Sequence, residues 1–187
     1  MRLHDLFADI LEFPKPLLSH QVTECVSLLS SVQQEAAGLM DQFRAFLDQT
    51  PPSGMGEIYA GTFGPQAACY PYVGYHLLGD GSHRRMFLAG LGEQYQMHDF
   101  SAADEAPDHL GVMLRFLARI DDEEEKEEMT FLYVLPALKR MLRGFVGRRT
   151  PYKGVLQALL LVLREGEETQ SDRTPVGGEV SEFPYSG

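Results

Sequence analysis

Apolar residues recur with the spacing of an α-helix through most of this chain, and this repeat constrains the fold more than any other feature. In one stretch they stand at positions i, i+3, i+4 and i+7, namely at Leu110, Met113, Leu114 and Leu117. Similar stripes occur near residues 3–11, 18–29, 39–47, 131–145 and 156–163. Alternation of apolar and polar residues never extends beyond about four positions. The sequence therefore predicts an all-α, single-domain helical bundle.

Prolines and glycines mark breaks in the first half of the chain. The first helix should end at the prolines of 14–16, and residues 51–54 form a second break. The pair Ser30–Ser31 either separates two helices or lies inside one long helix, and the pattern leaves both open. The stretch 55–82 is rich in glycine and tyrosine and is predicted to be the least regular part.

The second half contains clearer helix signals. We expect a short helix from Pro71 to Gly79, and a longer one over 82–98 with Ser82 as its N-cap. The acidic run 121–128 suits a solvated helix start, because the first turn favours anions. Pro136 should kink or restart the following helix. The last helix should open with Thr150 as N-cap and Pro151 at its first position.

The chain ends in a polar segment. Residues 1–165 are predicted to form the helical domain, and residues 166–187 have the composition of a C-terminal tail. The apolar anchors near the end are Phe183 and Tyr185. We expect one of them to pack on the domain or on a neighbouring copy, near Tyr72, as a crystal contact or as an autoinhibitory contact.

Composition limits the classes of partner. The formal net charge is −11 over 187 residues, which argues against nucleic acid and suits either a basic partner or high solubility. Neither a secretory signal nor an apolar run long enough for membrane insertion is present. The two cysteines, Cys25 and Cys69, form no disulfide or zinc pattern. We expect a cytoplasmic protein that is a monomer or a weak dimer.

The stretch 105–117 is the strongest candidate for a functional site. Pro107 suits the first position of a helix, which would place Asp108 in the first turn beside His109. One interpretation is a well-capped core helix with an exposed histidine. The other is a recognition pair with at least one side chain partly exposed, in which the Asp108 carboxylate takes a bidentate hydrogen bond from an arginine of a partner.

Other residue types add few chemical options. The six histidines form no His-x-x-x-His or Glu-x-x-His pair, so we expect no metal site and no cofactor. Glu57, Asp108 and His109 could form an acid–base set, but no serine or cysteine stands in a recognisable nucleophile context. Tyrosine can bury its ring while its hydroxyl stays hydrated, so the tyrosines of 59–75 suit a half-exposed groove. Phe63 is expected in the core.

Three motifs in order resemble one family. They are Glu105-Ala106-Pro107-Asp108-His109-Leu110, Glu57-Ile58-Tyr59-Ala60-Gly61-Thr62-Phe63 and Pro71-Tyr72-Val73-Gly74-Tyr75-His76. Over about residues 1–165 the chain resembles the NarJ/TorD-type redox-enzyme maturation chaperones, and it is closer to the nitrate-reductase branch. The resemblance implies a cytoplasmic all-α protein that assists assembly of molybdenum-cofactor oxidoreductases and is not an enzyme.

The resemblance also implies a site and a client. It places recognition of a peptide, such as a twin-arginine signal, on these positions: Asp108, His109, Tyr59, Tyr72 and Tyr75, with Glu57, Gly74 and Leu110 as weaker members. The chain lacks the tryptophan that some relatives use there. The client would be the apo catalytic subunit of a molybdenum oxidoreductase, held by its N-terminal segment until cofactor insertion. The alternatives are a small helical hydrolase using Glu57, Asp108 and His109, and a helical adaptor without a specific groove.

Overall fold

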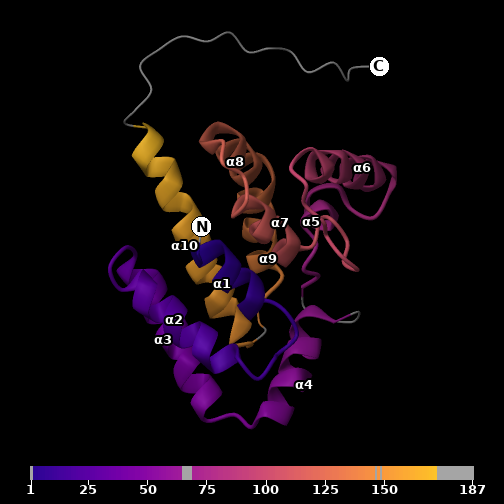
Figure 1. Ribbon diagram of the computed structural model, residues 1–187. Coiled ribbons are helices and arrows are strands. Elements are labelled where there is room, and N and C mark those ends of the chain that lie inside the picture. Colours follow the sequence, from indigo (N-terminus) through magenta and orange to yellow (C-terminus); the bar gives the residue numbers. More distant parts are fainter. Residues whose placement is uncertain (1, 65–68, 146, 148, 172–187) are drawn as a thin grey trace.

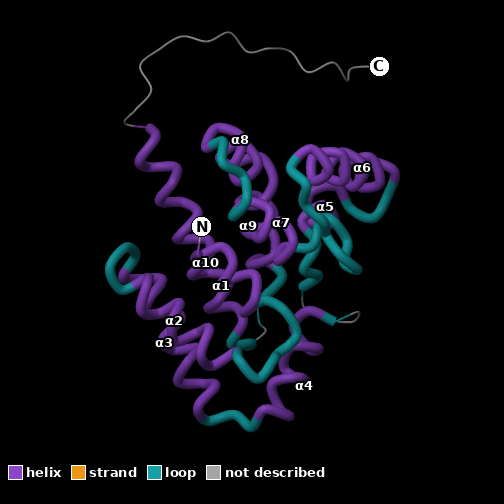
Figure 2. Tube along the Cα trace, viewed as in Figure 1, coloured by secondary structure: helices purple, strands orange, loops and turns teal. Residues whose placement is uncertain are grey.

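A computed structural model describes residues 2–64, 69–145, 147 and 149–171, and regular structure in these residues is helical (Figures 1 and 2). The all-α prediction is therefore confirmed for the described part of the chain. The helices in chain order are α1 Arg2–Ile10, α2 Leu18–Leu29, α3 Gln34–Asp48, α4 Pro52–Phe63, α5 Val73–Leu78, α6 Ser82–Met97, α7 Leu110–Leu117, α8 Glu123–Met129, the π-helical turn η1 Thr130–Val134, α9 Leu135–Arg143 and α10 Tyr152–Ser171.

The helices α1, α7, α9 and α10 form the centre of the molecule. Figure 1 shows α2 and α3 on one side of this centre and α5 and α6 on the other. Helix α1 packs on α2 and α7, and α10 packs on α3 and α9. Their facing sides are apolar and fully buried, as at Phe7, Met113, Leu138 and Leu159. Burial of these apolar stripes supplies the main driving force for the fold.

The structure resolves the question about residues 30–31 in favour of two helices. Helix α2 ends at Leu29, and the Ser30 hydroxyl donates back to the Val26 carbonyl over 2.8 Å. Helix α3 then begins at Gln34, with the Gln33 side chain accepting hydrogen bonds from the first free N–H groups. Local capping on both sides therefore ends one helix and starts the next.

The prediction of an irregular segment from residue 55 onward is wrong for its first part. Helix α4 extends over Pro52–Phe63, with its proline at the start of the helix. Each glycine inside a helix costs about 1 kcal/mol relative to alanine, which is why the sequence argued against this helix. Burial of Met55 and Phe63 offsets that cost, and Phe63 lies in the core as expected. Tertiary packing here outweighs local propensity.

The predicted restart at Pro136 is confirmed. Helix α8 ends at Met129, and η1 connects it to α9, in which Pro136 occupies one of the first two positions. In η1 the Leu135 N–H bonds to the carbonyl of Thr130, five residues earlier. A proline lacks the N–H that a regular helix needs, so a wider turn just before it avoids a broken α-helical ladder.

The C-terminal helix α10 begins at Tyr152, one residue later than predicted, and its ribbon continues to Ser171. The helix therefore extends into the segment that composition assigned to a tail, while Phe183 and Tyr185 lie outside the described residues. The division of the chain at residue 165 stays a prediction. The Tyr152 side chain is fully buried, and its hydroxyl has no hydrogen-bond partner among the described residues.

Candidate peptide-binding cleft

The site is organised by a short antiparallel contact between two segments far apart in sequence. The Val73 N–H donates to the Asp108 carbonyl over 2.8 Å, and the Leu110 N–H donates to the Pro71 carbonyl over 2.8 Å. This pairing brings the Tyr72 ring to 5.6 Å from the His109 ring. The expected proximity of Tyr72 to the Asp–His pair is therefore confirmed.

The helix after the pair starts later than predicted. Helix α7 begins at Leu110, and His109 is its N-cap, with Nδ1 accepting the Gly111 N–H over 3.2 Å. Pro107 therefore precedes the helix, and its carbonyl accepts the Tyr95 hydroxyl over 2.7 Å. The prediction of Pro107 at the first helical position is wrong, because the backbone of 108–109 forms the antiparallel contact and so is not helical.

The Asp108 carboxylate already holds an arginine, and that arginine is internal. Arg84 of α6 donates from Nε to Oδ2 over 2.8 Å and from Nη2 to Oδ1 over 3.0 Å. The guanidinium carbon also lies 5.2 Å from the Tyr72 ring centre. Hydrogen bonding to this carboxylate raises the pKa of Arg84. Asp108 is fully buried and His109 is only 7% exposed, so the prediction that one of them is partly exposed is wrong.

Gly74 makes room for this ion pair. A Cβ atom at this position would lie 2.8 Å from Asp108 Oδ2 and 2.8 Å from the Phe87 ring. Any larger side chain would therefore push against the carboxylate or against an aromatic ring that packs on the core. Glycine at position 74 is a steric requirement of the Asp108–Arg84 pair.

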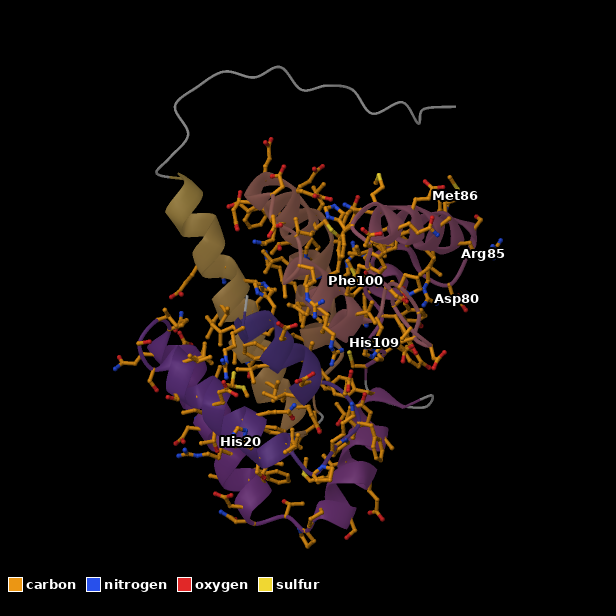
Figure 3. All side chains as sticks on the ribbon, in the orientation of Figure 1. His20, Asp80, Arg85, Met86, Phe100 and His109 are labelled. Carbon is orange, nitrogen blue, oxygen red and sulfur yellow. The ribbon has the colours of Figure 1, made fainter. Side chains whose placement is uncertain are left out.

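A cleft of about 920 Å³ lies beside His109. Its wall is formed by the connector after α1, by Tyr59 of α4, by the loop 99–105 and by one face of α7. Figure 3 shows two of its lining residues, Phe100 and His109, in the middle of the molecule. Phe13 on the connector is 60% exposed and meets the Tyr59 ring edge-on at 5.6 Å. The cleft thus offers aromatic surface at its mouth.

Glu105 and Glu12 are two of the carboxylates that line the cleft. Glu105 accepts hydrogen bonds from the Tyr72 hydroxyl over 3.4 Å and from the Ala106 N–H over 2.9 Å. Glu12 is ion-paired with Arg115 over 2.6 Å and with Lys15. Burial lowers the pKa of His109, and the negative charges of Glu105 and Glu12 oppose that shift. Its ring is therefore neutral at pH 7.

The same factors act on the tyrosine of the wall. Burial raises the pKa of Tyr59 to about 12, and the carboxylates of Glu105 and Glu12 act in the same direction. Its hydroxyl stays protonated and donates to the Leu11 carbonyl over 3.2 Å. The Tyr59 ring is thereby fixed between the cleft and the aromatic core.

The remaining predicted site residues lie elsewhere. Tyr75 packs edge-on against Tyr70 at 4.9 Å, and Leu110 is buried in the core. Glu57 is exposed on α4 and is not among the residues that line the cleft. Since the Asp108 carboxylate is bound by an arginine, Glu57, Asp108 and His109 do not form an acid–base set in this structure.

Sequence reasoning missed several residues of the cleft. They are Glu12, Phe13, Phe100, Val112 and Arg115, and the Arg84 partner of Asp108 was missed as well. Only Phe13 carried a local signal, because it is a large apolar residue that follows the end of a helical stripe. The others are brought together by tertiary packing and have no distinctive spacing.

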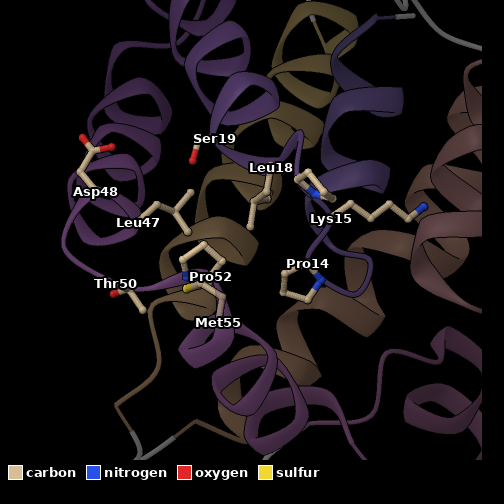
Figure 4. Close-up of a pocket in the computed structure, with 10 residues that line it drawn as sticks. Pro14, Lys15, Leu18, Ser19, Leu47, Asp48, Thr50, Pro52 and Met55 are labelled. Carbon is tan, nitrogen blue, oxygen red and sulfur yellow. The ribbon is translucent and has the colours of Figure 1, made fainter.

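A second hollow of about 620 Å³ lies between the start of α2, the end of α3 and the start of α4 (Figure 4). Its lining is largely apolar, with Leu18, Leu47, Pro52 and Met55 among the contributors. Lys15 of the α1–α2 connector lines both this hollow and the cleft. The connector therefore separates two neighbouring depressions.

Two other kinds of site, a metal centre and a membrane span, are not found in the described residues. Within them, no three His, Cys, Asp or Glu side chains converge as a potential metal site. None of the helices in this part of the chain is long and apolar enough to cross a membrane.

Comparisons with known proteins identify the family. A solved structure from Archaeoglobus fulgidus, described as a candidate redox enzyme maturation protein, shares the fold with a TM-score of 0.59 and 19% sequence identity, over 88% of this chain and 94% of that one. The curated proteins include no significant sequence match. The family model of the nitrate reductase delta subunit matches residues 5–149, a range that contains the whole cleft. This protein therefore belongs to the nitrate reductase delta subunit family, which confirms the resemblance inferred from its three motifs.

Proposed function

We propose that this protein is an assembly chaperone for a molybdenum-cofactor oxidoreductase. It binds the apo catalytic subunit in the cytoplasm, through an N-terminal segment, and releases it after cofactor insertion. Membership of the nitrate reductase delta subunit family and the maturation role assigned to the structural relative support this proposal. The observation that carries it is the cleft beside His109, which lies inside the family-matched region. No covalent chemistry and no cofactor are needed.

The chemistry of the cleft suits a segment that carries both cations and apolar residues. Phe13 and Tyr59 offer aromatic faces and edges for apolar side chains and for an arginine. Glu105 is exposed at the rim and can receive a guanidinium. Asp108 is not available for that role, because Arg84 occupies both of its oxygens. In this proposal the client arginine is held by Glu105 and not by Asp108.

The alternatives are less well supported. A hydrolase would need Glu57, Asp108 and His109 close together, whereas Asp108 is sequestered in an internal ion pair and Glu57 lies outside the cleft. An adaptor without a groove would show no affinity for an isolated peptide. Peptide binding therefore separates the chaperone from both alternatives.

The test uses the full chain. Affinity capture from the native host, followed by mass spectrometry, should recover the catalytic subunit of a molybdenum enzyme without its cofactor. A synthetic peptide of that subunit's N-terminal segment should bind in calorimetric titration. Glu105→Gln should weaken binding about tenfold, because a charged hydrogen bond is lost at a partly hydrated site. Asp121→Asn, which changes an exposed carboxylate outside the cleft, is the matched control. Recovery of no such subunit together with no peptide binding would refute the proposal.

A further inference from the structure

The His109 side chain lines the cleft and carries one ring N–H donor. Its Nδ1 accepts the Gly111 N–H over 3.2 Å, so this nitrogen carries a lone pair and no proton. Since burial keeps the ring neutral, the single ring proton resides on Nε2. Among the residues that the structure describes, Nε2 has no hydrogen-bond partner, although the side chain is only 7% exposed and lines the cleft.

The direction of this donor is fixed by the surrounding structure. The Tyr72 ring stands edge-on to the imidazole at 5.6 Å. The main chain on both sides of His109 is tied to residues 71–73 by the antiparallel contact. The preceding residue, Asp108, is held by Arg84 through two hydrogen bonds. The ring therefore cannot turn Nε2 toward another partner without breaking its own cap bond.

The charges around the ring select the chemistry of what this donor can bind. A cation is excluded as the direct partner, because an N–H group needs an acceptor. An anionic side chain would face the Glu105 carboxylate, whose hydrogen-bond donors among the described residues are the neutral Tyr72 hydroxyl and Ala106 N–H. The cations Arg84 and Arg115 are already paired with Asp108 and Glu12. A neutral acceptor remains, and an extended peptide offers one main-chain carbonyl per residue.

We infer that His109 Nε2–H donates a hydrogen bond to a main-chain carbonyl oxygen of the client segment in the cleft. This inference rests on the proposed function and refines it. It assigns three roles within the Glu-x-Pro-Asp-His motif: Glu105 holds a client cation, Asp108 positions the motif through Arg84, and His109 anchors the client main chain. Because the anchor contacts no client side chain, it sets the position of the segment without reading its sequence.

Two substitutions separate the two nitrogens of the ring. The amide oxygen of His109→Asn can replace Nδ1 as the cap but cannot reach the position of Nε2. The longer amide of His109→Gln can place an N–H donor near Nε2, and a glutamine can also cap a helix in this protein, as Gln33 does for α3. We expect His109→Asn to keep its thermal stability and to bind the N-terminal peptide about tenfold more weakly, as for one lost hydrogen bond. His109→Gln should keep its affinity within about threefold.

The control is His83→Asn, an exposed histidine of α6 outside the cleft, which should change neither property. Peptides in which one amide at a time is replaced by an ester have a weaker carbonyl acceptor. One such replacement should weaken binding to the wild type and leave binding to His109→Asn unchanged. If no ester position distinguishes the two proteins, or if His109→Asn binds the peptide like the wild type, the inference is wrong.

A measurement without peptide tests the same assignment. The ¹⁵N chemical shifts of the free protein at pH 7 should show His109 as the neutral ring protonated on Nε2. A proton on Nδ1, or a doubly protonated ring, would overturn the inference whether or not any peptide binds. A wild-type protein that shows the expected ring form but binds no client peptide would refute the proposed function, and with it the role given to the donor.

Discussion

The ion pair between Asp108 and Arg84 should contribute strongly to stability. Replacing Asp108 with alanine removes two charged hydrogen bonds of 2.8 and 3.0 Å and leaves a guanidinium whose side chain is only 16% exposed. Breaking a buried pair on one side typically costs about 3–5 kcal/mol. Because Arg84 retains some access to water, we expect the lower end, about 3 kcal/mol, in the free energy of unfolding. The midpoint of thermal unfolding should then fall by roughly 6–12 °C.

Urea unfolding followed by circular dichroism measures this loss, and the helical signal of the folded variant should stay close to that of the wild type. Asp80→Ala is the matched control, since Asp80 is 80% exposed and meets the same arginine at 3.4 Å. This control should change stability by no more than about 0.5 kcal/mol. The double variant Arg84→Ala/Asp108→Ala should lose less than the sum of its parts. Strict additivity, or an Asp108→Ala variant as stable as the wild type, would refute the buried-pair argument.

Three further predictions use matched substitutions. Gly74→Ala should lower the free energy of unfolding by about 1–3 kcal/mol, because the new Cβ collides with the Asp108 carboxylate and the Phe87 ring. Gly61→Ala, where a Cβ meets open space, should raise it by up to about 1 kcal/mol. Urea unfolding measures both changes. Tyr152→Phe should leave the free energy of unfolding unchanged, since it removes a buried hydroxyl without a partner among the described residues. Tyr95→Phe should lower it by about 0.5–1.5 kcal/mol in the same assay, because the hydrogen bond to the Pro107 carbonyl is lost. Burial lowers the pKa of His4 from 6.5 to about 4, so the free energy of unfolding should fall as the pH drops from 6.5 toward 4. This fall should be less steep in His4→Gln. An equal pH dependence of stability in the two proteins would contradict the prediction.

The helices that the sequence predicted well carry a local signal, either an apolar stripe or an acidic first turn. The segment 110–117 has an unbroken apolar stripe, and all but one of its residues are buried in the structure. In the acidic run 121–128, Asp122 caps α8 through the N–H groups of Glu124 and Glu125. Both signals are local, since the residues that decide the element stand within a few positions of one another.

The helix predictions were wrong where a segment distant in sequence makes the contact that determines the local structure. Helix α4 contains three glycines, and local propensity argued against it, but Met55 and Phe63 pack into a core formed by other helices. The start of α7 was placed at Pro107 because a proline suits a first helical turn. The pairing of residues 108–109 with the segment 71–73 delays the start of the helix to Leu110, and no residue pattern within 105–117 predicts that pairing.

The role of Asp108 could not be predicted from its sequence neighbours, because neither local interpretation, a capped core helix or a recognition pair, includes an internal arginine partner. The chain contains 16 lysines and arginines, and no spacing rule selects Arg84 from among them. A different position carried the relevant hint. Gly74 lies within a six-residue helix, where glycine costs about 1 kcal/mol relative to alanine and must have a steric reason. That reason is the close approach of Asp108 and Phe87, so the glycine marks the place where Asp108 is held from within the protein.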